Sequence, residues 1–265
     1  MMEKKEIIYN GESVKVFGTG SPDHVLVCFT DNITAFNKIK RAVIADKGKL
    51  NAAISTMIFN LLEKGGIKTH FIRQVSATEQ LCRRVEDIPI EVIVRNVVAG
   101  SMAARLGLEE GLRPSSTIYD LCYKNDDLCD PVINDYHAIA LGIVTREELD
   151  VIYGMTERIN AILLPLFRSV GIDLVDFKIE FGRLPGGEII LADEINPDSA
   201  RFWDAETGEK YDKDRFRRDM GKVGDAYRTI YGKLVSLCHP DGIPEGYPSA
   251  ELLSDGWTRN IQDND

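Results

Sequence analysis

The stretch that decides the fold is residues 174–204, which read LVDFKIEFGRLPGGEIILADEINPDSARFWD. Its first part alternates between apolar and charged residues, and the charged ones are Asp176, Lys178 and Glu180. A period of two over this length predicts a β-strand with one face in a core and the other facing polar groups. A Pro-Gly-Gly turn and a second apolar run, residues 189–195, follow, so the stretch predicts a β-hairpin.

The register of this hairpin would bring two carboxylates together. If Gly186 and Gly187 are the two turn residues, Glu180 lies opposite Asp193 and Lys178 lies opposite Ile195. Paired residues share a face, with Cβ atoms about 4.5–5.5 Å apart, so the two carboxylates would repel unless a proton, a lysine or a cation lay between them. A Mg²⁺ ion held by carboxylates and phosphate oxygens is one solution. A solvated strand face with a Lys–Glu pair is the alternative.

The composition is that of a soluble globular protein, with 44% hydrophobic and 28% charged residues in 265. A formal charge of −10 argues against a nucleic-acid partner, which would require a basic face. The five cysteines are scattered and form no Cys-x-x-Cys pair, so neither a disulfide framework nor a zinc site is predicted. The sequence shows no signal peptide and no apolar run of membrane length, so we expect a cytoplasmic protein with no membrane partner.

The chain divides into two predicted lobes and a tail. Residues 1–85 are expected to form a β-rich lobe, with antiparallel strands at 6–17 and 24–30, a helix at 50–64 ending at Gly65-Gly66, and strands at 68–73 and 80–84. The composition changes around 86–89, where we expect the hinge. Residues 86–238 are expected to form an α+β lobe, and residues 239–265 an irregular tail.

Within the second lobe, two helix starts carry local signals. Ser101 is expected to cap a short helix ending at Gly107, where free N–H groups beside Arg95 would suit a phosphate. Thr145 and Glu148 form a capping box that starts a long helix ending at Gly171. A final helix is expected from Asp212 or Asp214 to about residue 237.

No motif of covalent catalysis or of a phosphate loop is present. The chain lacks Gly-x-x-x-x-Gly-Lys-Ser/Thr and Gly-x-Gly-x-x-Gly, and it shows no Ser-His-Asp or Cys-His constellation. Without a phosphate loop, a cleft between the two lobes is the expected site for a nucleotide.

The stretch LVDFKIEFG followed by LADEINPDSARFWD resembles the SAICAR synthetase family of purine biosynthesis. The resemblance extends from about Tyr9 to Leu234. It includes the segments Thr34-Ala35-Phe36, Lys47-Gly48 with Asn51, Gly66-Ile67-x-Thr69-His70, residues 91–96 with Ala99-Gly100-Ser101, Lys124-Asn125-Asp126 with Asp130-Pro131, and residues 212–217.

The resemblance implies a two-lobed, ATP-grasp-like α+β fold with antiparallel sheets and nucleotide in the cleft between the lobes. It implies that residues 1–85 are the nucleotide-binding lobe and that residues 86–238 carry the metal and ribonucleotide sites. It implies an ATP-dependent ligase that joins L-aspartate to the carboxylate of the ribonucleotide CAIR and releases SAICAR, ADP and phosphate through an acyl phosphate. Mg²⁺ is the implied cofactor, and ATP, CAIR and L-aspartate are the implied partners. Whether copies of the chain form a homo-oligomer is left open.

Site residues are carried over by matching positions. Those implied for ATP are Lys15, Lys124, Glu180 and Asp193, and Glu180 and Asp193 would also bind Mg²⁺. Those implied for catalysis are Lys178, Asp176 and Arg201. Those implied for the ribonucleotide are Arg95, Ser101, Asp198, Ser199, Arg201, Asp214 and Arg217. For aspartate, residues 34–37 and 47–51 are the expected segments.

Two departures from the family pattern concern the nucleotide. Gly11-Glu12-Ser13-Val14-Lys15 stands where the family has Gly-Lys-x-Lys or Gly-Lys-x-Arg, and residues 112–117 replace a Pro-rich segment containing a Glu. Two other functions stay open from the residues alone. A small-molecule kinase would need no amino-acid substrate, and a non-catalytic nucleotide-binding module would bind ATP without forming a product.

Overall fold

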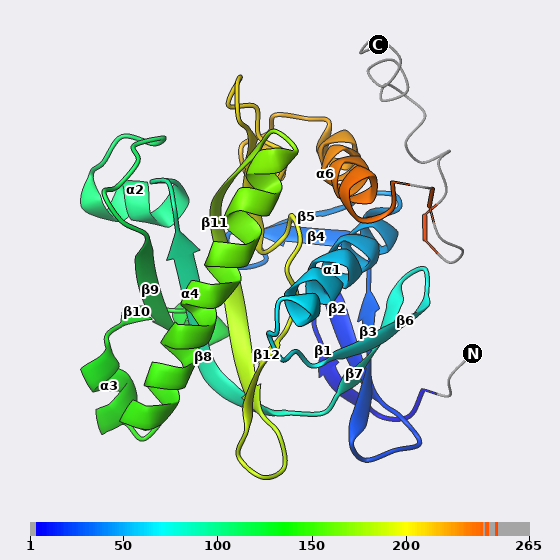
Figure 1. The fold of residues 1–265 in the computed structure, drawn as a ribbon, viewed down its shortest axis with the longest axis vertical. Coiled ribbons are helices and arrows are strands. Elements are labelled where there is room, and N and C mark those ends of the chain that lie inside the picture. The colour runs from blue at the N-terminus through cyan, green and yellow to red at the C-terminus, as the bar shows by residue number, and fades with distance from the viewer. Residues whose placement is uncertain (1–3, 241, 244–246, 249–265) are drawn as a thin grey trace.

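Two antiparallel sheets, one from each half of the chain, form the framework of this protein (Figure 1). The computed structural model describes residues 4–240, 242–243 and 247–248. Strands that pair antiparallel alongside separate helices make the fold α+β, as predicted from the sequence. Of the predicted tail, 239–265, all but a few residues lie outside this description.

The first sheet has the order β1-β2-β3-β7-β6. Its strands are β1 (Ile7–Asn10), β2 (Val14–Gly18), β3 (His24–Phe29), β6 (Phe71–Ser76) and β7 (Glu79–Arg83). The helix α1 (Lys47–Lys64) covers one face, where Ala52 packs with Val25 and Val27 of β3. As predicted, this helix stops at a Gly-Gly pair, of which Gly66 has the left-handed backbone (φ 78°).

The second sheet is built around β11 (Ile172–Arg183), which lies between β8 (Glu86–Arg95) and β12 (Ile189–Ala192). Beyond β8 lie β9 (Ile118–Tyr123) and β10 (Val132–Ile133), and β13 (Ala200–Asp204) also pairs with β11. The chain passes from the first sheet to the second between Arg83 and Glu86.

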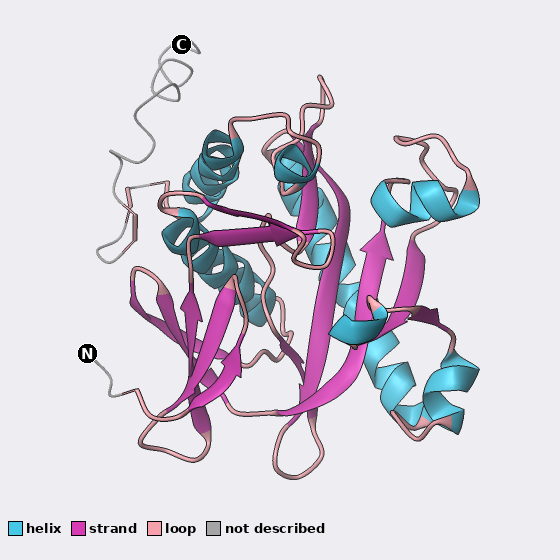
Figure 2. Ribbon diagram, turned by 180° about the vertical axis from the view of Figure 1, so that it is seen from behind, coloured by secondary structure: helices cyan, strands magenta, loops and turns pink. Residues whose placement is uncertain are grey.

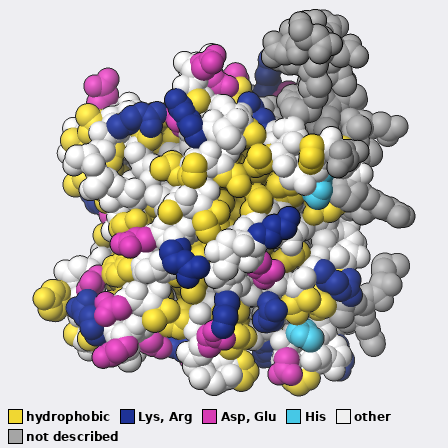
Figure 3. Space-filling model, in the orientation of Figure 1, with side chains coloured by type: hydrophobic (Ala, Val, Ile, Leu, Met, Phe, Trp, Pro, Cys, Tyr) yellow, Lys and Arg dark blue, Asp and Glu magenta, His cyan; other side chains and the backbone are white. Residues whose placement is uncertain are grey.

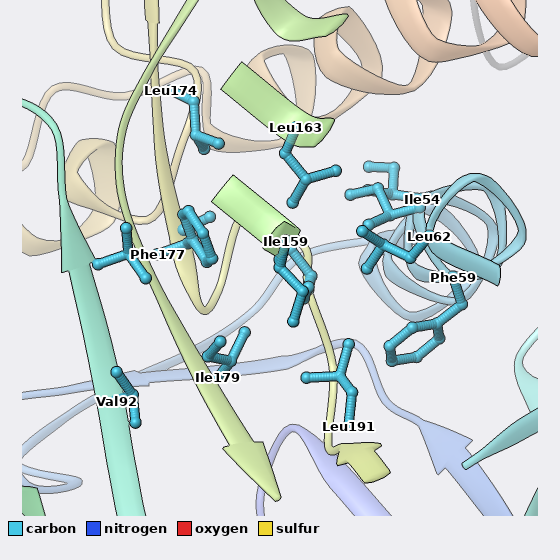
Figure 4. Packing of buried hydrophobic residues seen from close by; sticks show 14 of the residues in the cluster. Ile54, Phe59, Leu62, Val92, Ile159, Leu163, Leu174, Phe177, Ile179 and Leu191 are labelled. Atoms are coloured by element: carbon cyan, nitrogen blue, oxygen red, sulfur yellow. The ribbon is translucent and has the colours of Figure 1, made fainter. Parts of the chain in front are cut away.

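The helix α4 (Arg146–Ser169) begins with the predicted capping box of Thr145 and Glu148 and packs on β11. Figure 4 shows Ile159 and Leu163 of α4 between Phe177 of β11 and Ile54 of α1. One continuous core therefore joins the helices of both halves, which holds the polar face of β11 in a fixed place.

A separate two-stranded sheet, β4 (Asn32–Ala35) with β5 (Lys40–Val43), lies between the two larger sheets (Figure 2). Its cations contact the second half of the chain. Lys38 pairs with Asp126 at 2.8 Å, and Lys40 pairs with Asp219 at 2.6 Å. The remaining elements are α2 (Gly100–Leu106), η1 (Asp126–Leu128), α3 (Asp135–Ala140), α5 (Asp214–Arg217) and α6 (Val223–Cys238).

The predicted register of the central hairpin is wrong by one residue. Arg183 pairs with Ile189, and the N–H of Leu184 donates to the carbonyl oxygen of Glu188 at 2.8 Å. The loop therefore holds three residues, Pro185 to Gly187, rather than two. Glu180 consequently pairs with Ala192, and Asp193 follows the end of β12.

Two helix predictions also need correction. The N-cap of α2 is Ala99, so Ser101 is its second residue and its hydroxyl accepts a hydrogen bond from Arg95 instead. The expected single helix from Asp212 or Asp214 is two helices, α5 and α6, separated by Arg218 to Lys222. Asp212 and Asp214 are buried because their carboxylates bond to groups of neighbouring elements.

The face drawn in Figure 3 has apolar side chains gathered over its middle, with charged side chains of both signs around them. Val151 and Leu164 of α4 are among the exposed apolar residues of the chain. None of the helices in the described ranges has the length and apolar character needed to cross a lipid bilayer.

Candidate functional site

Lysines and carboxylates from four segments converge beside β11. The Nζ of Lys178 contacts Glu91 of β8 at 2.8 Å, Asp193 at 3.5 Å, and Glu180. The Nζ of Lys124, just after β9, contacts Glu180 at 2.5 Å. We call Glu91, Lys124, Lys178, Glu180 and Asp193 the lysine–carboxylate cluster. It joins four of the predicted residues with one that the sequence did not single out.

The backbone conformation of Asp193, and not strand pairing, brings its carboxylate into this cluster. Its φ of 59° lies in the left-handed region, which Asp and Asn adopt more readily than other non-glycine residues. The turn ends β12 and directs the carboxylate toward Lys178. Glu180 and Asp193 both contact Lys178, one of the groups expected between them, although the predicted pairing is wrong.

Charges in the cluster shift one another's protonation. Burial would raise the pKa of Glu180, but the ammoniums of Lys178 and Lys124 lower it to about 2. Burial and the charge of Glu180 together raise the pKa of Asp193 well above its ordinary value. Burial opposes the charge of Lys178, yet its carboxylate neighbours raise its pKa. The cluster is therefore crowded with negative charge, which additional cations would relieve.

Glu91 escaped the sequence analysis because its partner lies 87 residues away. It stands alone in the apolar run of residues 88–94 and faces Glu180 across the β8–β11 pairing. An acidic residue isolated in a buried strand needs a charged partner, so this isolation was the available signal.

Arginines and aspartates form a second group on the same strands. Arg95 of β8 pairs with Asp176 at 3.2 Å, and Arg201 of β13 pairs with Asp176 at 2.8 Å. Arg201 also contacts Asp214 at 3.0 Å, and Asp214 contacts Arg217 at 2.6 Å. We call Arg95, Asp176, Arg201, Asp214 and Arg217 the arginine–aspartate cluster. All five were predicted site residues, and the structure brings them together.

The two clusters are neighbours because they share two strands. Asp176 and Lys178 are two residues apart on β11, so their Cα atoms are about 7 Å apart on one face. On β8, Glu91 and Arg95 pair with Glu180 and Asp176 respectively. A ligand with two charged ends could therefore contact both clusters at once.

Gly100 gives Arg201 its place. A Cβ at this position would lie 2.3 Å from a guanidinium nitrogen of Arg201, and the glycine has φ 54°. Only a residue without a side chain allows the guanidinium to lie against the start of α2. Ser101, the next residue, accepts a hydrogen bond from Arg95 at 3.1 Å, so the predicted Arg95–Ser101 association is confirmed without the predicted cap.

The carboxylates of this second cluster are strongly held. Burial would raise the pKa of Asp214, but Arg201 and Arg217 lower it to about 2. Asp212, next to the cluster, is fully buried and receives backbone N–H donors from Phe202 and Asp214. Burial and the charge of Asp214 nevertheless raise the pKa of Asp212 to about 7.

Asp198 and Ser199 lie in the loop between β12 and β13 and not in either cluster. The buried Asp198 carboxylate contacts Lys47 at 2.6 Å, Asn51 at 2.8 Å and the Tyr227 hydroxyl at 2.6 Å. The Ser199 hydroxyl donates to the carbonyl oxygen of Glu194 at 3.1 Å. These bonds tie the loop that follows Asp193 to α1 and α6, so Lys47 and Asn51 of the expected aspartate segment serve that loop here.

Lys15 is not joined to the lysine–carboxylate cluster by any ion pair or hydrogen bond within the described ranges. It lies on β2 opposite Cys28 of β3, while its neighbours Val14 and Val16 pack toward α1. Alternation along the strand therefore places Lys15 on the face away from α1. Glu12 is the acidic residue of the segment Gly11–Lys15, which differs from the family pattern, and it pairs with Arg41 of β5 at 3.0 Å.

Two hollows open elsewhere on the surface. One of about 450 Å³ lies between α4 and the tip of the central hairpin, with Met155 and Ile189 in its lining. Another of about 530 Å³ lies where the connection between the sheets meets the same tip, beside Val85 and Pro185. Neither lining includes a residue of the two clusters, so neither hollow is part of the site described above.

Comparison with known proteins identifies the family of this chain. The SAICAR synthetase family profile matches residues 7–234. Phosphoribosylaminoimidazole-succinocarboxamide synthase of Clostridium beijerinckii is 55% identical over 233 residues, which cover 88% of this chain and 99% of that protein. The chain is therefore longer than this relative, and both clusters fall within the family match.

Solved structures show the same fold. The synthase of Ehrlichia chaffeensis superposes with a TM-score of 0.85 at 43% identity, covering 86% of this chain and 98% of that one. A SAICAR synthetase (Type-2) in complex with ADP has a TM-score of 0.84 at 44% identity, covering 87% and 98%. The predicted two-lobed, ATP-grasp-like fold is thereby confirmed. This chain belongs to the SAICAR synthetase family.

Proposed function

We propose that the lysine–carboxylate cluster binds the phosphates of ATP and that the arginine–aspartate cluster binds the ribonucleotide. As a SAICAR synthetase, the chain is an ATP-dependent ligase of purine biosynthesis that joins L-aspartate to the carboxylate of CAIR. The observation that carries the proposal is the placing of both clusters on one face of β8 and β11, about 7 Å apart along the strand.

The reaction proceeds in two steps, phosphoryl transfer and then amide formation. A carboxylate oxygen of CAIR takes the γ-phosphoryl group of ATP, which forms an acyl phosphate and releases ADP. The amine of L-aspartate then attacks the acyl carbon, phosphate leaves with the C–O electron pair, and the amide nitrogen loses a proton. Neither step needs a protein nucleophile, in keeping with the residues found in both clusters.

Lys178 and Lys124 suit the first step. Their ammoniums lie beside Glu180 and are held by carboxylates at fixed distances, so they can stabilise the phosphoryl group as its charge redistributes. Lys178 is the residue nearest to the second cluster, which makes it the natural contact of the transferring group. Lys15 remains a proposed nucleotide contact from the first lobe, residues 1–85, across the hinge from residues 86–238.

Glu180 and Asp193 fit a Mg²⁺ ion. Both carboxylates already share one cation, and burial together with the charge of Glu180 raises the pKa of Asp193, so a dication would favour its ionised form. In the described ranges no three His, Cys, Asp or Glu side chains form a complete metal-binding group, so phosphate oxygens would supply further ligands. When bound, Mg²⁺ supplies charge neutralisation at the phosphates.

The arginine–aspartate cluster suits a phosphate monoester. Arg95, Arg201 and Arg217 present planar guanidiniums, which bind phosphate in a fork. Ion pairs with Asp176 and Asp214 fix these guanidiniums, and Ser101 adds a hydroxyl. Asp198 and Ser199 shape the loop that leads into β13, the strand of Arg201, and we assign them to the ribonucleotide site on that ground.

The experiment that tests the function is ADP release by the purified protein with Mg²⁺, ATP, CAIR and L-aspartate, omitting each in turn. We expect ADP only from the complete mixture, with SAICAR in equal amount. ADP formation without aspartate would instead favour a kinase. Because all substrates are soluble metabolites, we propose a cytoplasmic location, and sedimentation of the same preparation would establish whether it is a homo-oligomer.

A further inference from the structure

We infer that Glu91 is a positioning residue. It keeps the Lys178 ammonium in place while Glu180 and Asp193 bind the cation of the nucleotide. The inference rests on the role proposed above for Lys178. It concerns a residue that neither the sequence pattern nor the family resemblance singled out.

The three carboxylates around Lys178 are not equivalent. Glu180 is shared with Lys124, and together with Asp193 it is the proposed ligand of the cation. The Glu91 carboxylate, at 2.8 Å, makes its one ion pair and one side-chain hydrogen bond of the described ranges with Lys178. Glu91 is thus the carboxylate dedicated to Lys178.

Burial places Glu91 behind Lys178. Its side chain is 9% exposed, whereas the side chain of Lys178 is 29% exposed, so a ligand arriving from solvent meets the lysine first. A buried carboxylate without a cation is costly, and across the part of the chain that the structure describes Glu91 forms an ion pair with Lys178 and with no other cation. The pair is therefore expected to persist when a ligand binds.

The backbone of Glu91 cannot shift easily. It lies inside β8, paired with Cys122 of β9 on one side and Glu180 of β11 on the other. Its neighbours Ile90 and Val92 are fully buried. A side chain on a strand that is paired on both sides has a more precise position than one on a loop such as that of Asp193.

A consequence follows for the loaded site. If Glu180 and Asp193 bound the cation, Glu91 would be the one partner left to Lys178. One of the three N–H donors of Lys178 would then stay with Glu91, and the other two would be available to phosphoryl oxygens. Glu91 thereby aims the ammonium without touching the ligand itself.

The test begins with Glu91→Gln, which keeps the shape and removes the charge. We expect kcat to fall about 10- to 100-fold, the usual cost of losing a supporting group, with the KM values for ATP and CAIR within about 3-fold. Glu86→Gln is the matched control, because Glu86 lies on the same strand with a side chain that is 76% exposed. Its kcat should stay within about 2-fold. A kcat of Glu91→Gln equal to that of the control would overturn the inference.

A double-mutant cycle tests whether Glu91 affects kcat through Lys178. If Glu91 acts through Lys178, adding Glu91→Gln to Lys178→Ala should change the residual kcat by less than about 2-fold. An equal loss in both backgrounds would mean that Glu91 acts independently, and the inference would fail. Wild-type kcat in Lys178→Ala would refute the proposed role of Lys178 itself, which is a different failure.

Readouts without turnover complete the test. Thermal unfolding and ADP binding measured in EDTA should be similar in Glu91→Gln and the wild type if the role is positioning alone. Glu91→Asp, which keeps the charge, should recover part of the lost kcat, and it replaces Glu91→Gln if that variant does not fold. No recovery, or a changed Mg²⁺ requirement with full kcat at saturation, would overturn the inference in favour of a structural or metal-ligand role.

Discussion

The Asp193 carboxylate lies 3.5 Å from the Lys178 ammonium although the two residues are not paired across the hairpin. The left-handed backbone of Asp193 (φ 59°) produces this contact by turning the chain at the end of β12. His70, next to β6, supports the turn: its backbone N–H donates to the Leu191 carbonyl oxygen at 2.8 Å. The position of the proposed metal carboxylate thus depends on a buried residue of the first half of the chain.

Asp193→Asn should lower turnover and leave the fold intact. Asparagine tolerates the left-handed backbone but lacks the charge for a cation, so we expect kcat to fall about 100-fold, as when one electrostatic group of an active site is lost. Because burial and Glu180 raise the pKa of Asp193, the neutral variant should unfold at the same or a higher temperature. Steady-state kinetics and thermal unfolding check both statements, and a large loss of stability with normal kcat would contradict them.

Arg201→Ala should mainly weaken ribonucleotide binding. The change removes a fork-shaped cation and leaves Asp176 and Asp214 partly unpaired, so we expect the KM for CAIR to rise about 100-fold, equivalent to nearly 3 kcal/mol, with little change for ATP. Arg113→Ala is the control, since Arg113 pairs with Asp173 at the surface. Unchanged kinetics in Arg201→Ala and in Asp193→Asn would refute the site assignment.

Gly100→Ala and Gly107→Ala form a matched pair at the two ends of α2. Both glycines have left-handed backbones, which cost alanine about 1–2 kcal/mol. A Cβ at Gly107 meets no atom within 4 Å, whereas one at Gly100 would displace the Arg201 guanidinium. We therefore expect Gly100→Ala to lose at least as much stability as Gly107→Ala, because Arg201 would shift against Asp176 and Asp214, and to be the one variant with a raised KM for CAIR. Equal KM values for the two variants would show that Arg201 is not held there for the ribonucleotide.

Acid should destabilise the protein through His70. Burial lowers the pKa of His70 to about 4, so the folded protein binds fewer protons than the unfolded chain between about pH 6.5 and 4. Stability therefore falls as pH drops through this range, and the full effect of His70 is about 3 kcal/mol. In His70→Gln the pH dependence of urea unfolding should be shallower by that amount. Parallel curves for variant and wild type would contradict the assignment.

Much of the fold could be predicted because its signals are local. The alternation along residues 175–181, the capping box at Thr145 and the Gly65-Gly66 stop depend only on neighbours in the chain, and the structure confirms each. The hairpin register was missed because a three-residue and a two-residue loop differ by one hydrogen bond, closed here between Leu184 and Glu188. The sequence predicted one helix at residues 212–237 where the structure has two. The reason is that Asp212 does not cap a helix but accepts a hydrogen bond from Phe202, which lies outside its own segment.

The sequence by itself determined which side chains share the polar face of β11, since a period of two is a local property of an extended chain. Only the tertiary structure decided what they meet. Lys178 finds Glu91 from 87 residues away, and Asp198 finds Lys47 across the two halves of the chain. Such partners are chosen by how β8, α1 and α6 pack around β11, and packing depends on the whole core rather than on any one segment.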